Sequence, residues 1–155
     1  MNDRHLYRAK RCDTGEWVER YLIYAKKDYY ICENPYECMN EYSSLNGQSY
    51  GFGGFKWVDP STICQCTGLM DKNRKLIWEN DIVRFQFDND DCPFMNKDTK
   101  KRVGKVFFSD FRASWSVAMG RKCSKELNTD LFRYVQNGNR VEVICNIFDN
   151  PELIE

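Results

Sequence analysis

Eight cysteines and one histidine are the residue types in this sequence that most readily bind metals or act as nucleophiles. Cys64 and Cys66 are separated by one residue, so the alternation of a strand would place both on one face. A structural zinc site usually takes cysteine pairs spaced C-x2-4-C, and the sequence lacks a second matching pair. We therefore favour small buried hydrophobic residues over zinc ligands. All eight thiols are predicted to be free, without metal or cofactor, in a reducing cytoplasm.

No group of residues has the pattern of a catalytic site. A nucleophile–histidine triad would depend on His5, the only histidine, which we interpret as an ordinary residue of the first strand. Glu79 and Asp81 have the residue types of a general acid and base, but they precede a predicted strand. There an acidic side chain typically caps backbone N–H groups. We predict no catalytic residue and no enzymatic activity.

Two charged clusters lie between residues 88 and 102. The acidic run at 88–91 does not fit a calcium loop, because Pro93 stands at the required glycine and Thr99 at the twelfth-position glutamate. The basic residues Lys97 and 100–102 have the charge to hold phosphates. Pairing with the nearby acidic run, or plain solvation, is the better interpretation.

Charge and hydropathy narrow the range of partners. The chain balances 23 Lys and Arg residues against 23 Asp and Glu residues, which argues against a general electrostatic hold on nucleic acid or on an anionic membrane. No apolar run reaches the roughly 18 residues of a membrane span. The start at Met1–His5 lacks the apolar core of a signal peptide, so we expect a cytoplasmic protein.

The segment 51–55 combines three glycines with two phenylalanines. It is not a dinucleotide-binding fingerprint, because the G-x-G-x-x-G spacing and the strand–helix context are missing. Its aromatic rings have two plausible roles: they seal an edge of the protein's own core, or they stack on bases or on a partner. We take Phe52, Phe55 and Trp57 as candidate partner contacts, since the loop 34–55 is too long for a simple connector.

Nearly all of these candidate residues lie in or beside predicted strands. The chain has the length of one domain, and 15% of its residues are aromatic, which favours strands. Short apolar or alternating runs predict strands at 6–12, 16–25, 29–32, 62–67, 81–87, 103–108, 114–119 and 141–148. The spacing of Leu127, Leu131 and Val135, followed by Asn137 and Gly138, predicts one short helix.

The order of these elements predicts a mainly β fold with one short helix. Residues 1–78 form an N-terminal β-hairpin or sheet segment that contains the long loop. Residues 79–155 have the strand order of a small SH3-like barrel, and the two segments are expected to form one compact unit.

Three segments resemble one protein family. Residues 65–83 read QCTGLMDKNRKLIWENDIV and are similar to the signature QYTGLKDKNGKEIYEGDIV of the YopX family of phage and prophage proteins. Residues 143–153 read VICNIFDNPEL and resemble its closing VIGNIYENPEL. Residues 7–10 are loosely similar to its opening FRAWD. The resemblance frames the whole chain and implies no settled biochemical activity.

The departures from the family pattern have a physical meaning. The family usually carries glycine where this chain has Arg74, Asn80 and Cys145. If these turns need a left-handed backbone, Asn80 is the mildest change, and Arg74 costs about 1 kcal/mol. Cys145 indicates a position where a neighbouring group passes close by.

Together these features favour an interaction or regulatory module of phage or prophage origin in a bacterial host. Its expected partners are an unknown host or phage protein and further copies of itself, because short strands leave edges that must be covered. The alternative is a nucleic-acid-binding protein on the SH3-like barrel. An enzyme such as a ribonuclease is a third hypothesis that rests on fold analogy alone.

Overall fold

A computed structural model describes residues 3–34, 54–86, 100–119, 129–136 and 139–153. The chain forms two compact units, Met1–Cys66 and Thr67–Glu155. Both are built from antiparallel strands, and α2 (Leu131–Gln136) is the one α-helix of the described residues. The predicted mainly β class with one short helix is confirmed. None of the helices in the described ranges has the length and apolarity to cross a membrane.

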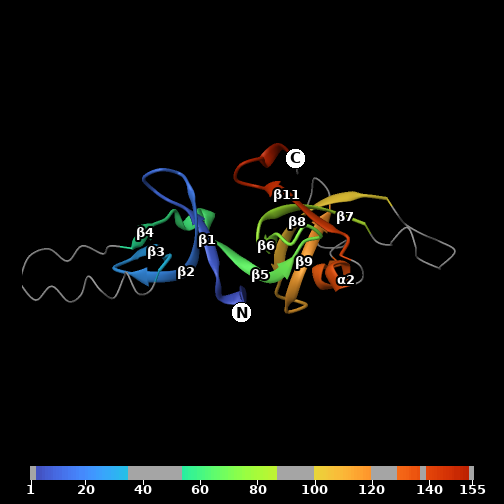
Figure 1. The fold of residues 1–155 in the computed structure, drawn as a ribbon, viewed down its shortest axis with the longest axis horizontal. Helices are drawn as coiled ribbons and strands as arrows, with labels where there is room; N and C mark the ends of the chain where they lie inside the picture. The colour runs from blue at the N-terminus through green and yellow to red at the C-terminus, as the bar shows by residue number, and fades with distance from the viewer. Residues whose placement is uncertain (1–2, 35–53, 87–99, 120–128, 137–138, 154–155) are drawn as a thin grey trace, which may run out of the picture. The chain divides into compact units, whose positions relative to one another are not determined.

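The first unit is a sheet of short strands, coloured blue to green in Figure 1. Its strand order is β4-β3-β2-β1-β5. The strands are β1 (Tyr7–Lys10), β2 (Trp17–Ala25), β3 (Asp28–Cys32), β4 (Phe55–Trp57) and the first part of β5 (Cys64–Met70). Two 3-10 helices, η1 (Asp3–His5) and η3 (Pro60–Thr62), complete the unit.

Buried apolar side chains from four segments form the core of the first unit. Ala9, Val18, Ile31 and Val58 are buried there, and half-buried rings and aliphatic side chains pack against them. Burial of each Val or Ile side chain contributes roughly 1.5–3 kcal/mol relative to exposure. This is the driving force that gathers strands as short as three residues into a sheet.

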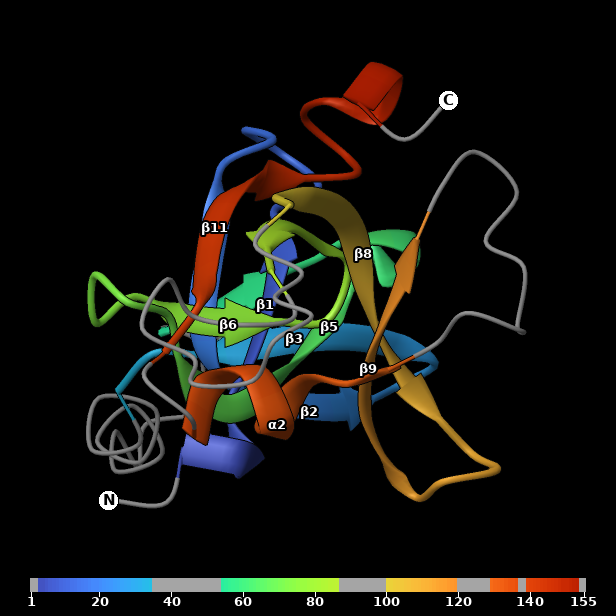
Figure 2. The same cartoon turned by 90° about the vertical axis from the view of Figure 1, so that its right-hand side faces the viewer.

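The second unit continues β5 and adds a five-stranded sheet. The C-terminal part of β5 pairs with β6 (Leu76–Trp78). The larger sheet has the order β10-β9-β8-β7-β11, with α2 beside β9 (Figure 2). Its strands are β7 (Asp81–Phe85), β8 (Arg102–Ser109), β9 (Ser114–Met119), β10 (Thr129–Asp130) and β11 (Val141–Asn146), and η5 (Pro151–Leu153) follows. The SH3-like barrel stays a prediction.

The core of the second unit is larger than that of the first. It buries Ile77, Val83, Phe85, Val106, Val117, Leu131, Tyr134 and Val141. The β8–β9 pair approaches closely at Gly104, where an added Cβ would lie 2.5 Å from the carbonyl oxygen of Ala118. Helix α2 begins at a cap, since the carboxylate of Asp130 accepts a hydrogen bond from the backbone N–H of Phe132.

The positions where the family carries glycine do have unusual backbone. Arg74 and Asn80 both have a φ of 64°, in the left-handed region. The expected condition for strain is therefore met at both turns, and Arg74 bears the larger penalty. A register shift between β11 and β7 follows Val143, and Cys145 is the residue at which the pairing resumes.

Candidate functional site

The predicted contact residues lie on the outer face of the first unit. Directly paired residues of neighbouring strands point to the same side of a sheet, and Ile31 of β3 points into the core. The alternate residues therefore form three rows on the opposite side, of which one, Ala25–Asp28, adjoins the hairpin turn. The other two rows are Tyr21–Cys32–Phe55 and Ile23–Tyr30–Trp57, which we call the aromatic face.

The aromatic face is apolar and partly open to solvent. Trp57 is 53% exposed and Tyr21 is 41% exposed, whereas Cys32 is buried. The rings of Tyr30 and Phe55 meet edge to face, with their centroids 6.5 Å apart. Phe55 and Trp57 thus share one face as candidate contacts. Phe52 lies outside the described residues.

Most of the residues that were considered for metal binding or catalysis lie in the described part of the chain, where they have structural surroundings. Cys64 and Cys66 are fully buried, as predicted, and the Cys64 thiol donates to the carbonyl oxygen of Thr62 at 3.4 Å. Within the described ranges no three His, Cys, Asp or Glu side chains gather as a metal site would require. His5 is exposed in η1 and not in the expected strand, because that strand begins only at Tyr7. The acidic run at 88–91 lies outside the described residues.

Asp71 fastens the β5–β6 turn to β11. Its carboxylate is buried, and Oδ1 accepts hydrogen bonds from the backbone N–H groups of Asn73 and Lys75 at 2.8 and 2.9 Å. Oδ2 accepts from the N–H of Val143 at 3.0 Å. The N–H of Lys72 also donates to the carbonyl oxygen of Val141 at 2.9 Å. The turn is therefore fixed against the strand that carries Glu142.

A second pair of turns is fixed in the same way around β7. Asp81 is buried, and its Oδ2 accepts from the N–H of Trp78 at 2.9 Å, which confirms the predicted capping role. Asp81 pairs with Asn146 at the end of β11. The Asn146 side chain accepts hydrogen bonds from the N–H groups of Phe148 and Asp149 at 2.9 and 3.0 Å. Both residues shape backbone turns.

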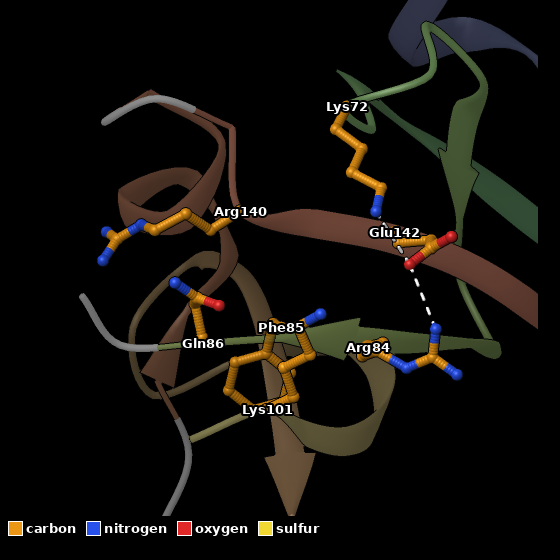
Figure 3. Close-up of a pocket in the computed structure, with 7 residues that line it drawn as sticks. All are labelled: Lys72, Arg84, Phe85, Gln86, Lys101, Arg140 and Glu142. Atoms are coloured by element: carbon orange, nitrogen blue, oxygen red, sulfur yellow. Dashed lines mark hydrogen bonds and ion pairs between the residues drawn. The ribbon is translucent and has the colours of Figure 1, made fainter. Parts of the chain in front are cut away.

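A small pocket opens where these fixed segments meet in the second unit (Figure 3). Its volume is about 210 Å³. Four cationic side chains and one carboxylate contribute to its wall, together with Phe85 and Gln86. The charged residues are Lys72, Arg84, Lys101, Arg140 and Glu142, which with Phe85 and Gln86 we call the basic pocket.

Glu142 organises one side of the basic pocket. Its Oε2 atom accepts hydrogen bonds from the Lys72 ammonium at 2.9 Å and from the Arg84 guanidinium at 3.1 Å, so the carboxylate lies between the two cations (Figure 3). The hydrogen bond from Lys72, reinforced by the charges of Lys72 and Arg84, lowers the pKa of Glu142. Arg84 and Glu142 are partners in the β7–β11 register, which explains their common side of the sheet.

Arg140 borders the pocket from the segment before β11. Its guanidinium carbon lies 5.6 Å from the ring centroid of Tyr134, a cation–π distance. The buried Tyr134 ring in turn lies 5.1 Å from that of Phe85. This aromatic support holds Arg140 in one place.

Sequence reasoning did not identify the basic pocket. Only Lys101 belongs to the basic run that was considered for phosphate, and the other cations come from separate segments. Alternation of Val83, Arg84 and Phe85 marks Arg84 as outward-facing, but this signal is equally typical of a solvated charge.

Comparison with known proteins identifies the family of the chain. A family model described as YopX protein matches residues 6–155, nearly the whole sequence. The chain belongs to the YopX family. A comparison with curated proteins finds no match. The signature positions that this member shares with its family include Asp71, Asp81 and Asn146, and all three shape turns of the second unit. The signature therefore has a structural role here.

Proposed function

We propose that this YopX family member is a non-enzymatic interaction module of phage or prophage origin that binds protein through the aromatic face. The observation that carries the proposal is the composition of that face. Its two rows hold six uncharged side chains, and the most exposed of them is Trp57. Contiguous exposed apolar surface typically marks an interaction site, and aromatic side chains dominate the energetics of such sites.

The proposed occupant in the isolated protein is a second copy of the chain. A two-fold interface places the same face of both copies in contact, so a charged side chain in it would face the same charge on the second copy. The two rows themselves contain no charge, and the nearest charge given by the register is Asp28 in the adjoining row at the hairpin end. Nucleic acid is the less favoured occupant of this face, because binding to phosphates requires Lys or Arg, and the rows contain neither.

Sedimentation velocity over a wide range of protein concentration tests this proposal. We expect the wild-type chain to dimerise and the double variant Tyr21→Ala, Trp57→Ala to stay monomeric. The melting temperature should hardly change, because these two side chains are the exposed ones of the face. The matched control is Phe111→Ala, since Phe111 is 97% exposed and belongs to the second unit, not to the aromatic face.

Two results would count against the proposal. If the wild-type chain is monomeric at every concentration, a second copy does not bind to the aromatic face. A large fall in melting temperature with dimerisation intact would assign the rings to the core of the fold. The salt dependence of binding distinguishes a protein partner from nucleic acid. Apolar association is insensitive to salt or strengthened by it, whereas binding through phosphate contacts weakens steeply as salt rises.

A further inference from the structure

The basic pocket holds more positive than negative charge. Lys72 and Arg84 share the single carboxylate of Glu142. Within the part of the chain that the structure describes, Lys101 and Arg140 pair with no acidic side chain. We propose that this pocket binds the phosphate group of a small phosphate monoester, independently of the aromatic face.

The charge of a phosphate monoester matches the excess in the pocket. Four cationic residues and one carboxylate line the pocket, and a phosphate monoester carries about −1.5 to −2 charges at pH 7. A carboxylate or a phosphodiester carries only one negative charge and neutralises less of the excess. Guanidinium groups such as those of Arg84 and Arg140 also have the fork geometry that binds phosphate oxygens in pairs.

Two cations of the pocket are held in place before any ligand arrives. Arg84 is fixed by Glu142, and Arg140 by the ring of Tyr134. Because the cations are pre-positioned, little conformational entropy is lost on binding.

The size of the pocket favours a single phosphate group. Its volume of about 210 Å³ is below the roughly 300 Å³ at which pockets for whole drug-sized ligands begin. It therefore takes the phosphate and the atoms next to it, and the rest of the ligand remains outside. The chain as a whole has zero net charge, so the attraction is local and does not extend along a nucleic-acid strand.

Isothermal titration calorimetry of the full chain at low salt tests this inference with AMP, adenosine and inorganic phosphate. We expect AMP and inorganic phosphate to bind and adenosine to give no heat. Arg140→Gln should weaken AMP binding at least tenfold. Lys101→Gln should weaken it several-fold, and its exposed position leaves the fold intact. Arg112→Gln removes the same charge as Arg140→Gln from the exposed β8–β9 turn, outside the pocket, and should bind AMP like the wild type.

Three results would overturn the inference. If adenosine bound as tightly as AMP, the pocket would not recognise the phosphate group. An equal loss in the Arg112 and Lys101 variants would show an unspecific charge effect. A 5′-hydroxyl oligonucleotide binding as tightly as its 5′-phosphorylated twin would assign the pocket to the strand backbone. Preference for the phosphorylated twin supports a monoester carried by a strand end, and binding of AMP with no binding of either oligonucleotide supports a free monoester.

Discussion

The Oδ2 atom of Asp71 accepts a hydrogen bond from the backbone N–H of Val143 at 3.0 Å, across 72 residues of sequence. The other oxygen, Oδ1, accepts hydrogen bonds from the backbone N–H groups of Asn73 and Lys75 in the same turn. Because both oxygens are used as acceptors, an isosteric amide would turn at least one donor toward another donor. We expect Asp71→Asn to lower the free energy of unfolding by about 1–3 kcal/mol, measured by urea denaturation.

The control for this variant is Asp110→Asn, the same substitution at an exposed position of the second unit. Surface changes of this kind usually stay within about 0.5 kcal/mol. Equal effects of the two variants would mean that Asp71 contributes no more than an ordinary surface carboxylate.

The left-handed backbone at Arg74 predicts a stabilising substitution. Arg74→Gly relieves a side-chain penalty at φ 64° and should raise the free energy of unfolding by about 1 kcal/mol. Asn80→Gly, at the same φ, should raise it less, because asparagine tolerates this conformation better than arginine does. Thermal denaturation of both variants ranks the two effects. The opposite ranking would contradict the strain argument.

Burial predicts different reactivities for the cysteines. Cys12 is exposed, whereas Cys32, Cys64 and Cys66 are buried. Time-resolved alkylation followed by peptide mass spectrometry should label Cys12 first and the other three only as the protein unfolds. Partial burial, and then the charge of Asp59, raises the pKa of the Cys12 thiol, so it should react more slowly than an unperturbed thiol.

Two measurements complete the thiol test. Cys12→Ser should remove the label from the Cys12 peptide and leave the slow labelling of Cys32, Cys64 and Cys66 unchanged. Thiol titration under denaturing, non-reducing conditions should count eight free thiols, and one zinc per chain by metal analysis would refute the prediction made from the sequence.

The ion pairs of Glu142 predict a pH-dependent stability. Its pKa in the folded protein lies below the usual 4.5 because Lys72 donates a hydrogen bond and because Lys72 and Arg84 are positively charged. Stability from these pairs is therefore complete above the unfolded-state pKa and is lost as pH falls through the folded-state pKa. The melting temperature of Glu142→Gln should be lower than that of the wild type at pH 7, and the two should converge in acid. The difference should be small and should shrink at high salt, since these side chains are exposed to solvent. A difference in melting temperature that persists in acid would contradict this prediction.

Local pattern was enough to predict most strands of the fold. The alternation in 114–119 predicts β9 with its observed bounds, and the predicted strand 29–32 lies within β3. The strand β4 was not predicted. It has three residues next to a glycine, and it exists because Phe55, Lys56 and Trp57 pair with β3. No local signal encodes that pairing.

The two surfaces differ in how far sequence reasoning could reach. Phe55 and Trp57 stood out as aromatic residues beside a glycine-rich segment, and the register then joined them to Tyr21 and Tyr30. The basic pocket gathers cations from the β5–β6 turn, β7, and the segments before β8 and β11. Each of them looks like a solvated surface charge in the sequence, and only the tertiary fold brings them together.

The late position of β11 sets the order in which the chain can fold during its synthesis. The first unit has all its strand partners once residue 66 has left the ribosome. In the second unit, β7 lacks one neighbour until residues 141–146 emerge, and Asp71 until then has no Val143 to bind. Translation proceeds at about 5–20 residues per second, so β7 waits several seconds with one edge unpaired. During that interval the nascent second unit exposes a strand edge open to pairing with other chains.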